Sequence, residues 1–183
     1  NRVTKGKQQT LPIRTISFFL LFGFLRFKGE YFTRLVYDSR KANQNAVIKF
    51  GSSALSFAYS LDPTSVPLYW YTGNARALAK DYTGALRDFE EAHKQHPYNR
   101  NVLNDLASAC SLKGNKTKAI ALYKEAARIS PRFDDPKLNL AVIYLRENNP
   151  EEALSWLNQL MHNSDSRTRY TQLANSLLSG KNP

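Results

Sequence analysis

The chain has 183 residues, and 42% of them are hydrophobic, which is enough to build a packed core and excludes disorder throughout. Its formal net charge is +11, from 26 Lys and Arg residues against 15 Asp and Glu residues. The single cysteine, Cys110, excludes an internal disulfide and a zinc site of paired cysteines. The first residue is Asn1 and the only methionine is Met161, so we expect the chain to be a segment of a longer protein.

The positive charge is concentrated near the N-terminus. Residues 1–41 contain nine Lys and Arg residues and two acidic ones, a net charge of +7 that leaves +4 for the rest of the chain. These charges flank an apolar run from Ile16 to Leu25, and they are not interleaved with polar groups that could read bases. Such a pattern favours a lipid surface over nucleic acid as the anionic partner. We therefore expect residues 1–29 to contact a membrane surface, and we expect no nucleic-acid partner.

The apolar run is bracketed by Arg14 and Arg26. Alone it is too short to span a bilayer, which takes about 20 helical residues. Three interpretations stay open: the end of a transmembrane helix, an interfacial helix, or a helix docked on the rest of the protein. Docking is included because four apolar side chains share one helical face: Phe18, Leu21, Phe22 and Leu25.

A period of 34 residues runs through the remaining chain. It aligns Pro63, Pro97 and Pro131, each of which follows an apolar stretch with helical spacing. This period is typical of the tetratricopeptide repeat, a pair of antiparallel helices that buries its apolar face only by stacking on neighbouring pairs. The chain therefore resembles tetratricopeptide-repeat proteins. The resemblance implies an all-α fold, a right-handed α-solenoid of helix-turn-helix repeats.

Three repeats fit this frame, at residues 66–99, 100–133 and 134–167. The first has small residues at positions 8, 20 and 27, an aromatic at position 24 and a proline at position 32, namely Gly73, Ala85, Ala92, Phe89 and Pro97. Small residues at these positions let paired helices approach closely. We expect Ala85, Ala119 and Ala153 to be buried where helices cross.

The flanking segments complete the predicted stack. Residues 30–65 fit the frame loosely, and we expect a degenerate first repeat with helices over 31–42 and 45–61. Residues 168–183 are expected to form a capping helix and a tail, because a solenoid has to cover its last apolar face. Residues 1–29 would then precede the repeats as a basic, apolar juxtamembrane segment. The pattern predicts about nine helices and no strand in the repeats.

Motifs of catalytic and cofactor sites are missing from the sequence, including phosphate-binding glycine loops, nucleophile elbows and zinc-binding helices. We therefore predict a chain that acts by binding, with no enzymatic activity, no cofactor and no metal. The expected partner is a protein or peptide.

In this repeat family the first helix of each pair lines a concave groove. Tryptophan can anchor a peptide there, and side-chain amides can pair with its backbone. The predicted groove consists of Trp70, Asn74, Asn101, Asn104, Ser108 and Asn139. Trp70 has an alternative role, which is packing against residues 55–59 of the degenerate repeat.

The carboxylate clamp with which some members of the family hold chaperone C-termini is not matched. That clamp uses Lys and Asn side chains, followed by Lys and Arg. Here Trp70 stands in place of the first Lys, Asp105 in place of the second Asn, and Asp135 in place of the second Lys. Two acidic residues would repel a ligand carboxylate, so we predict that the chain has no clamp.

A second resemblance is more specific. Five stretches are similar to the C-terminal repeat region of bacterial O-antigen ligase or polymerase-like membrane proteins: residues 26–30, 61–71, 96–99, 102–104 and 129–133. In that family the repeats follow a membrane part that carries the glycan chemistry. The resemblance implies a scaffold at the bacterial inner membrane for envelope-glycan assembly, with residues 11–27 as the end of the last span and the catalytic part outside this chain. The alternative is a free cytoplasmic adaptor or co-chaperone-like regulator.

Overall fold

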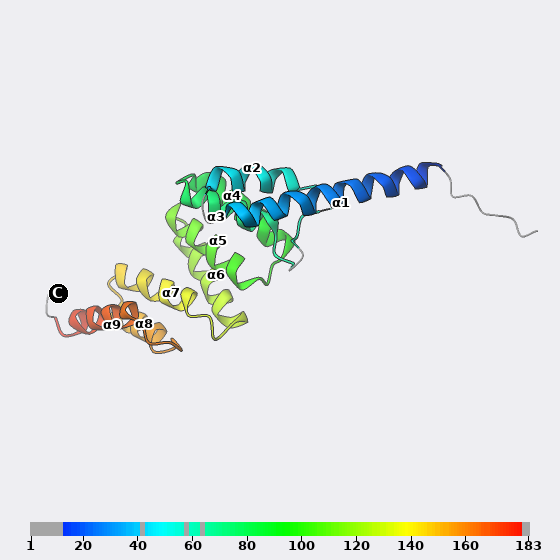
Figure 1. The fold of residues 1–183 in the computed structure, drawn as a ribbon. Helices are drawn as coiled ribbons and strands as arrows, with labels where there is room; N and C mark the ends of the chain where they lie inside the picture. The colour runs from blue at the N-terminus through cyan, green and yellow to red at the C-terminus, as the bar shows by residue number, and fades with distance from the viewer. Residues whose placement is uncertain (1–12, 41–42, 57–58, 63–64, 181–183) are drawn as a thin grey trace, which may run out of the picture.

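The computed structural model describes residues 13–40, 43–56, 59–62 and 65–180, with side chains from residue 17 onward. Nine α-helices lie in these ranges, and each packs mainly on its neighbours in the chain (Figure 1). The helices are α1 (Ile13–Ser39), α2 (Gln44–Ala54), α3 (Leu68–Leu78), α4 (Tyr82–Gln95), α5 (Arg100–Leu112), α6 (Lys116–Ile129), α7 (Asp135–Arg146), α8 (Pro150–Leu157) and α9 (Asp165–Leu178). The predicted all-α fold of stacked helix pairs is confirmed.

The second helix of each later pair begins after a short turn. A polar residue precedes α4, α6 and α8, and its side chain accepts a hydrogen bond from a backbone N–H in the first turn of the helix. Such a bond satisfies one of the donors that a helix start leaves unpaired. The bonds run to Asp81 from Gly84 (2.9 Å), to Asn115 from Lys118 (3.2 Å) and to Asn149 from Glu152 (3.2 Å).

Small residues sit where the paired helices meet. Ala85, Ala119 and Ala153 are 1%, 0% and 0% exposed, as predicted. Gly73 of α3 lies so close to Phe89 of α4 that an added Cβ would come within 2.7 Å of the ring. Close approach of the two helices is therefore what requires glycine at this position.

The first helix pair departs from the prediction. α1 begins at Ile13, well before the expected start at residue 31, and continues through 27 residues without a break. This stretch contains no proline, so none of its residues removes a backbone donor or forces a kink. α2 ends at Ala54 instead of residue 61, because Leu55 adopts extended backbone and Ser56 pairs with Tyr59 in an isolated bridge.

Asp62 fastens the connection between α2 and α3. Its side chain is 5% exposed, and its carboxylate accepts hydrogen bonds from the Val66 N–H (2.8 Å), from the Tyr71 hydroxyl (2.8 Å) and from the Tyr37 hydroxyl of α1. Burial raises the pKa of Tyr71, and its hydrogen bonds with Asp62 and Tyr37 raise that pKa further. α1 and α3 are thus joined to the connecting loop through one buried carboxylate.

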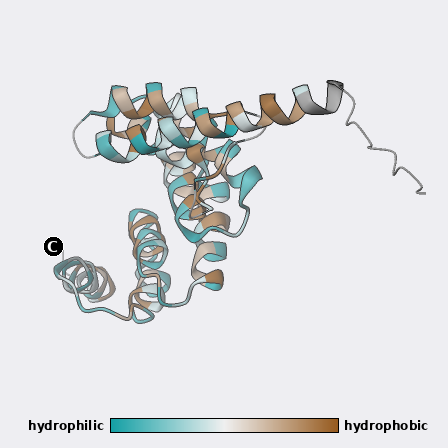
Figure 2. Ribbon diagram, turned by 45° about the vertical axis from the view of Figure 1, so that its right-hand side comes forward, coloured by the Kyte–Doolittle hydropathy of each residue, from teal (hydrophilic) through white to brown (hydrophobic). Residues whose placement is uncertain are grey.

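α1 has two dissimilar halves. Gly29, Thr33 and Val36 are buried at helical spacing, so the C-terminal half packs on the repeats. The N-terminal half extends beyond the body as an apolar rod (Figures 1 and 2), and Phe18 and Phe24 on it are 56% and 62% exposed. Phe18, Leu21 and Phe22 are all exposed, so the alternative in which this segment docks on the repeats is wrong for these side chains. Within the described residues, no helix has the length and apolar content that crossing a bilayer requires.

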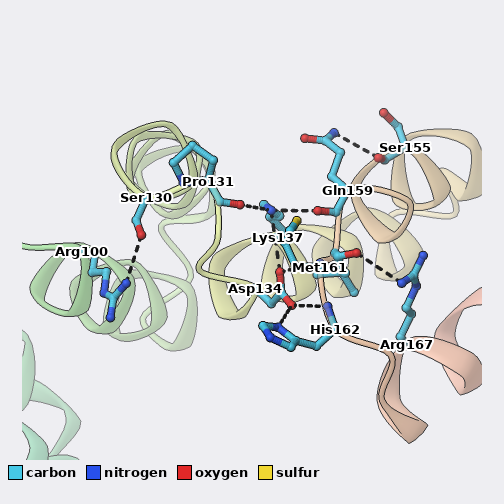
Figure 3. A network of polar contacts seen from close by, with 11 residues as sticks. Arg100, Ser130, Pro131, Asp134, Lys137, Ser155, Gln159, Met161, His162 and Arg167 are labelled. Atoms are coloured by element: carbon cyan, nitrogen blue, oxygen red, sulfur yellow. Dashed lines mark hydrogen bonds and ion pairs between the residues drawn. The ribbon is translucent and has the colours of Figure 1, made fainter.

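A polar network closes the other end of the stack (Figure 3). Lys137 is 4% exposed, and its ammonium donates to the carbonyls of Pro131 (2.5 Å) and Gln159 (2.8 Å). Asp134 accepts hydrogen bonds from the backbone N–H groups of Met161 and His162, both at 2.9 Å. The loop between α8 and α9 is therefore tied to the start of α7. α9 then packs on α8 as the predicted cap, beginning slightly earlier than residue 168.

Candidate functional site

The predicted groove residues lie on α3, α5 and α7, the first helices of three successive pairs. α3 also contacts α5, although α4 separates them in the chain. Side chains of α3 can therefore reach side chains of α5 directly. We call the surface formed by α3, α5 and α7 the first-helix face.

Three of the six predicted residues meet around one carboxylate that the prediction did not include in the site, and a fourth is joined to it through Asn104. Asp105 accepts hydrogen bonds from Trp70 Nε1 (2.8 Å) and Asn74 Nδ2 (3.4 Å) at Oδ2, and from Asn104 Nδ2 (3.1 Å) at Oδ1. Asn104 Oδ1 in turn accepts from Asn139 Nδ2 at 3.2 Å. We call these five residues the polar cluster. It links all three helices of the first-helix face.

Burial sets the electrostatic character of the polar cluster. It raises the pKa of Asp105, and the hydrogen bonds from Trp70, Asn104 and Asn74 lower that pKa by less than burial raises it. The nearby charge of Asp135 raises it further. A carboxylate held partly out of water is stabilised by a cation and destabilised by a second anion. The centre of the first-helix face therefore disfavours an anionic ligand group.

The two remaining predicted residues lie outside the cluster. The Asn101 N–H donates to the capping side chain of Asn99 at 3.0 Å, and no hydrogen bond within the described residues uses the Asn101 side chain. Ser108 Oγ donates to the Asn104 carbonyl (3.0 Å) and lies 2.8 Å from the Tyr123 hydroxyl. Ser108 thus joins α5 to α6 instead of facing α3.

Spacing was the signal that could have identified Asp105. The hydrogen bonds between Trp70 and Asp105 and between Asn104 and Asn139 each join residues that are 35 apart. This separation is one repeat period plus one residue. Polar pairs at that spacing on successive first helices are therefore candidates for direct contact.

Trp70 is half-buried and packs towards the next repeat. Its ring meets the Tyr71 ring edge-on, with centroids 5.0 Å apart, and it packs against the apolar cluster that includes Phe89 and Leu106. Leu55 and Tyr59, the alternative contacts, belong to a different cluster. Trp70 therefore packs towards the following repeat and stays partly exposed.

The surface beside Trp70 is hollowed. A hollow of about 350 Å³ lies between the end of α1, the start of α2, and α3, and we call it the Trp70 hollow. Its walls are mainly apolar, with a few polar groups. It is lined by Arg40, Gln44, Val47, Trp70, Tyr71, Asn74, Ala75 and Leu78.

Comparison with known families gives two matches. Two models described as tetratricopeptide repeat match residues 72–132 and 113–177, which together extend over more than half of the chain. An F-box protein of Arabidopsis thaliana is 35% identical over 69 residues, which amount to 38% of this chain and 19% of that protein. The aligned part is therefore a small fraction of the F-box protein.

Solved structures share the fold at low identity. A tetratricopeptide repeat protein from Parabacteroides merdae superposes with a TM-score of 0.72 at 16% identity, over 84% of this chain and 61% of that one. The first repeat domain of Spaghetti, bound to the HSP90 peptide SRMEEVD, superposes with a TM-score of 0.58 at 17% identity, over 66% of this chain and 98% of that one. Identities this low show a common fold alone.

Proposed function

Because the chain belongs to the tetratricopeptide-repeat family, we propose that it is an adaptor that binds a peptide segment of another protein on its first-helix face. One observation carries the proposal: Trp70 and Asn74 stand side by side at the edge of the Trp70 hollow. A half-exposed tryptophan beside a hollow provides the kind of anchor on which protein interfaces depend. The peptide-bound repeat domain of similar fold supports a peptide as the class of ligand.

The polar cluster supports an extended ligand. A peptide backbone brings unpaired N–H and C=O groups, which have to find partners when it binds. Asn74, Asn104 and Asn139 place three amides in a row across α3, α5 and α7. Asn104 is 8% exposed and links the other two, and Asn74 and Asn139 are the partly exposed amides that a ligand can reach. Because these amides are held in position by Asp105 and Asn104, little side-chain entropy is lost when a ligand binds to them.

The proposed ligand mode differs from a carboxylate clamp. Asp105 and Asp135 lie near each other on the first-helix face, and the burial of Asp105 makes a second anion unfavourable there. A chaperone C-terminus held through its terminal carboxylate is therefore a poor candidate for the polar cluster. We propose an internal peptide segment instead.

Selection of peptides tests the adaptor proposal. The purified chain is used to select binders from a library of random peptides, and the affinity of the best binder is then measured for two tryptophan variants. We expect Trp70→Ala to weaken binding by about 1–2 kcal/mol, because buried aromatic anchors dominate interface energies. Trp156→Ala is the matched control, since Trp156 is the other half-buried tryptophan and lies on α8, outside the first-helix face.

Melting curves of both variants separate lost binding from lost folding. Failure to select any peptide would overturn the adaptor proposal. Equal affinity of the two variants would remove Trp70 from the site. Both results are readable only if each variant still melts cooperatively.

A membrane-attached form of the adaptor is the second candidate. The exposed apolar half of α1 favours it, because Phe19, Leu20 and Phe27 are 63%, 70% and 70% exposed and the segment around them is basic. Apolar bulk between positive charges suits an anionic lipid surface. The comparisons support the repeat part alone and lend no support to a parent O-antigen ligase. The free adaptor is therefore the better supported form.

Co-sedimentation with vesicles tests this second candidate. We expect the chain to bind vesicles that contain phosphatidylglycerol and to be released as salt rises, because each Lys or Arg near the surface contributes about 1 kcal/mol that salt screens. Binding that is equal at low and high salt would show a purely apolar attachment. No binding at low salt would overturn the membrane-attached form and leave the free adaptor standing.

A further inference from the structure

The walls of the Trp70 hollow are apolar because their polar atoms face elsewhere. Trp70 Nε1 donates to Asp105 at 2.8 Å, and the Tyr71 hydroxyl donates to Asp62 at 2.8 Å. Both rings therefore present carbon surface to the hollow. Val47 and Ala75, which are 3% and 4% exposed, add aliphatic surface at the same place.

Three polar groups at the hollow keep unused hydrogen-bonding capacity. The guanidinium of Arg40 lies 5.5 Å from the centre of the Tyr37 ring and forms no ion pair within the described residues. The Gln44 side chain likewise makes no hydrogen bond in the described part of the chain. Asn74 donates through Nδ2 to the Trp70 carbonyl and to Asp105, which leaves its Oδ1 free to accept from a ligand.

The size of the hollow limits what can enter it. Its volume of about 350 Å³ is close to the lower end of ligand pockets, which run from about 300 to 1,000 Å³. A large cofactor would not be enclosed, whereas one bulky side chain and the backbone on either side of it would. An apolar side chain is the occupant that matches the walls.

The charges around the hollow determine which charge is favoured on a ligand group that lies next to it. Arg40 lines the hollow together with Trp70, whereas Asp105 is bonded to the indole nitrogen and is not part of the lining. A guanidinium stacked on an aromatic ring keeps its edge available to bind a carboxylate in a planar, two-point contact. The end of the ligand near Arg40 is therefore favoured as an anion, and the end near Asp105 is not.

We infer that the Trp70 hollow takes an aromatic or large aliphatic side chain of a partner protein, next to an Asp or Glu that pairs with Arg40. This inference rests on the proposed adaptor function and specifies its ligand. The Asn74 Oδ1 accepts a backbone N–H of the same segment, and Gln44 borders the ligand on the α2 side. The Trp70 hollow thus acts as the selective end of the first-helix face.

The peptide selection described above is read for composition and then followed by measurements on one synthetic copy of the most enriched peptide. We expect enrichment of a bulky apolar residue beside an acidic one. Binding is followed through Trp70 fluorescence in a Trp156→Phe background, which leaves one tryptophan in the chain. Replacing the bulky residue of the peptide by alanine should weaken binding tenfold or more.

Arg40→Gln tests the ion pair. We expect it to lower the affinity for the acidic peptide by about two- to fivefold, as for an exposed ion pair. The affinity for a peptide in which glutamine replaces the acidic residue should not change. Arg132→Gln is the matched control, because Arg132 is also exposed and lies in the turn between α6 and α7, outside the hollow. Gln44→Phe, which places a phenyl ring of the protein itself at the hollow, should lower the affinity for both peptides about tenfold.

The outcomes separate the inference from the function on which it rests. Selected peptides that lack the apolar and acidic pair, or that bind equally well to Arg40→Gln and Gln44→Phe, would overturn the inference while the adaptor function stands. A library that yields no binder would overturn both. We expect Arg40→Gln to lower the affinity for the acidic peptide alone, and Arg132→Gln to leave the affinity for both peptides unchanged.

Discussion

The two ends of the helix stack differ in whether their surface is covered. At the C-terminal end, α9 covers α8, and the half-buried side chain of Asp134 and the buried side chain of Lys137 tie the last loop to α7. At the N-terminal end, α1 continues past its last packing contacts as an exposed apolar rod, and the Trp70 hollow opens beside its other terminus. One end is closed by polar bonds, and the other keeps surface that could bind a partner.

This difference shows how a repeat protein can be asymmetric despite a regular sequence period. Each repeat contacts only its neighbours, so the two terminal units meet different conditions from the middle ones. A terminal unit either covers its apolar face or leaves it available. In this chain stability is expected to depend on the C-terminal closure, and binding on the N-terminal end.

The largest expected loss comes from opening the closed end. Lys137→Met keeps the apolar stem but removes the ammonium that binds the Pro131 and Gln159 carbonyls. Two carbonyls would then lose a charged donor, so we expect the free energy of unfolding to fall by about 3 kcal/mol, at about 1.5 kcal/mol for each hydrogen bond to a charged group. Chemical denaturation measures it. Lys49→Met, at an exposed lysine of α2, should change it by less than about 0.5 kcal/mol, and an equal loss at both positions would contradict the closure.

A smaller loss of stability is expected in the middle of the stack, with which both ends can be compared. Ala119 is fully buried, so Ala119→Leu would overpack the contact between α5 and α6 and lower stability by about 2 kcal/mol. Ala121 lies on the same helix but is exposed. Ala121→Leu should therefore leave the melting curve unchanged. An unchanged curve for Ala119→Leu would show that the helices can part there at no cost.

The closed end should also depend on pH. Burial raises the pKa of Asp134, but hydrogen bonds from the Met161 and His162 N–H groups and from the His162 ring outweigh it, so the net pKa is lowered. A lowered pKa means that the stabilisation is present above the unfolded value of about 3.9 and is lost as pH falls through the folded value. Asp134→Asn should cost about 1 kcal/mol at pH above about 5.

That cost should shrink as pH falls from about 5 to about 3, because the wild-type carboxylate becomes protonated. Denaturation of wild type and variant at matched pH gives the difference directly. A difference that persists at the lowest pH would mean that the charge of Asp134 contributes nothing to the closure.

The smallest effect is expected at the exposed rod. Phe24 is 62% exposed, so Phe24→Ser should change the free energy of unfolding by less than about 0.5 kcal/mol. Val36, in the same helix but fully buried, serves as the contrast, because Val36→Ala should cost more than 1 kcal/mol, on the order of a buried methyl deletion. If both substitutions were equally costly, the N-terminal half of α1 would be packed after all.

The middle of the fold was predictable because its determinants are local and periodic. Ala85, Ala119 and Ala153 recur at a fixed spacing, and so do the capping residues Asp81 and Asn115. The start of α1 was not predictable in this way. Helix-forming residues continue upstream of the repeats, and no local signal distinguishes a packed helix from its exposed continuation.

The candidate site was predictable only in part. The family's groove positions located Trp70 and Asn74, but the partner that orients them, Asp105, came into view only through the contact between α3 and α5. Lys137 is a similar case. A lysine at a helix start is normally expected to face solvent, and its burial depends on carbonyls of two loops, at Pro131 just before α7 and at Gln159 beyond α8.

The continuity of α1 has a mechanical consequence. From Ile13 to Gly29 the helix rises by about 24 Å at 1.5 Å per residue, with no proline to act as a hinge. A flexible linker would let the repeats rotate freely relative to a partner or surface bound to the exposed half of α1. A helix without a break instead keeps a fixed orientation between its exposed half and α2, which it contacts and which borders the Trp70 hollow.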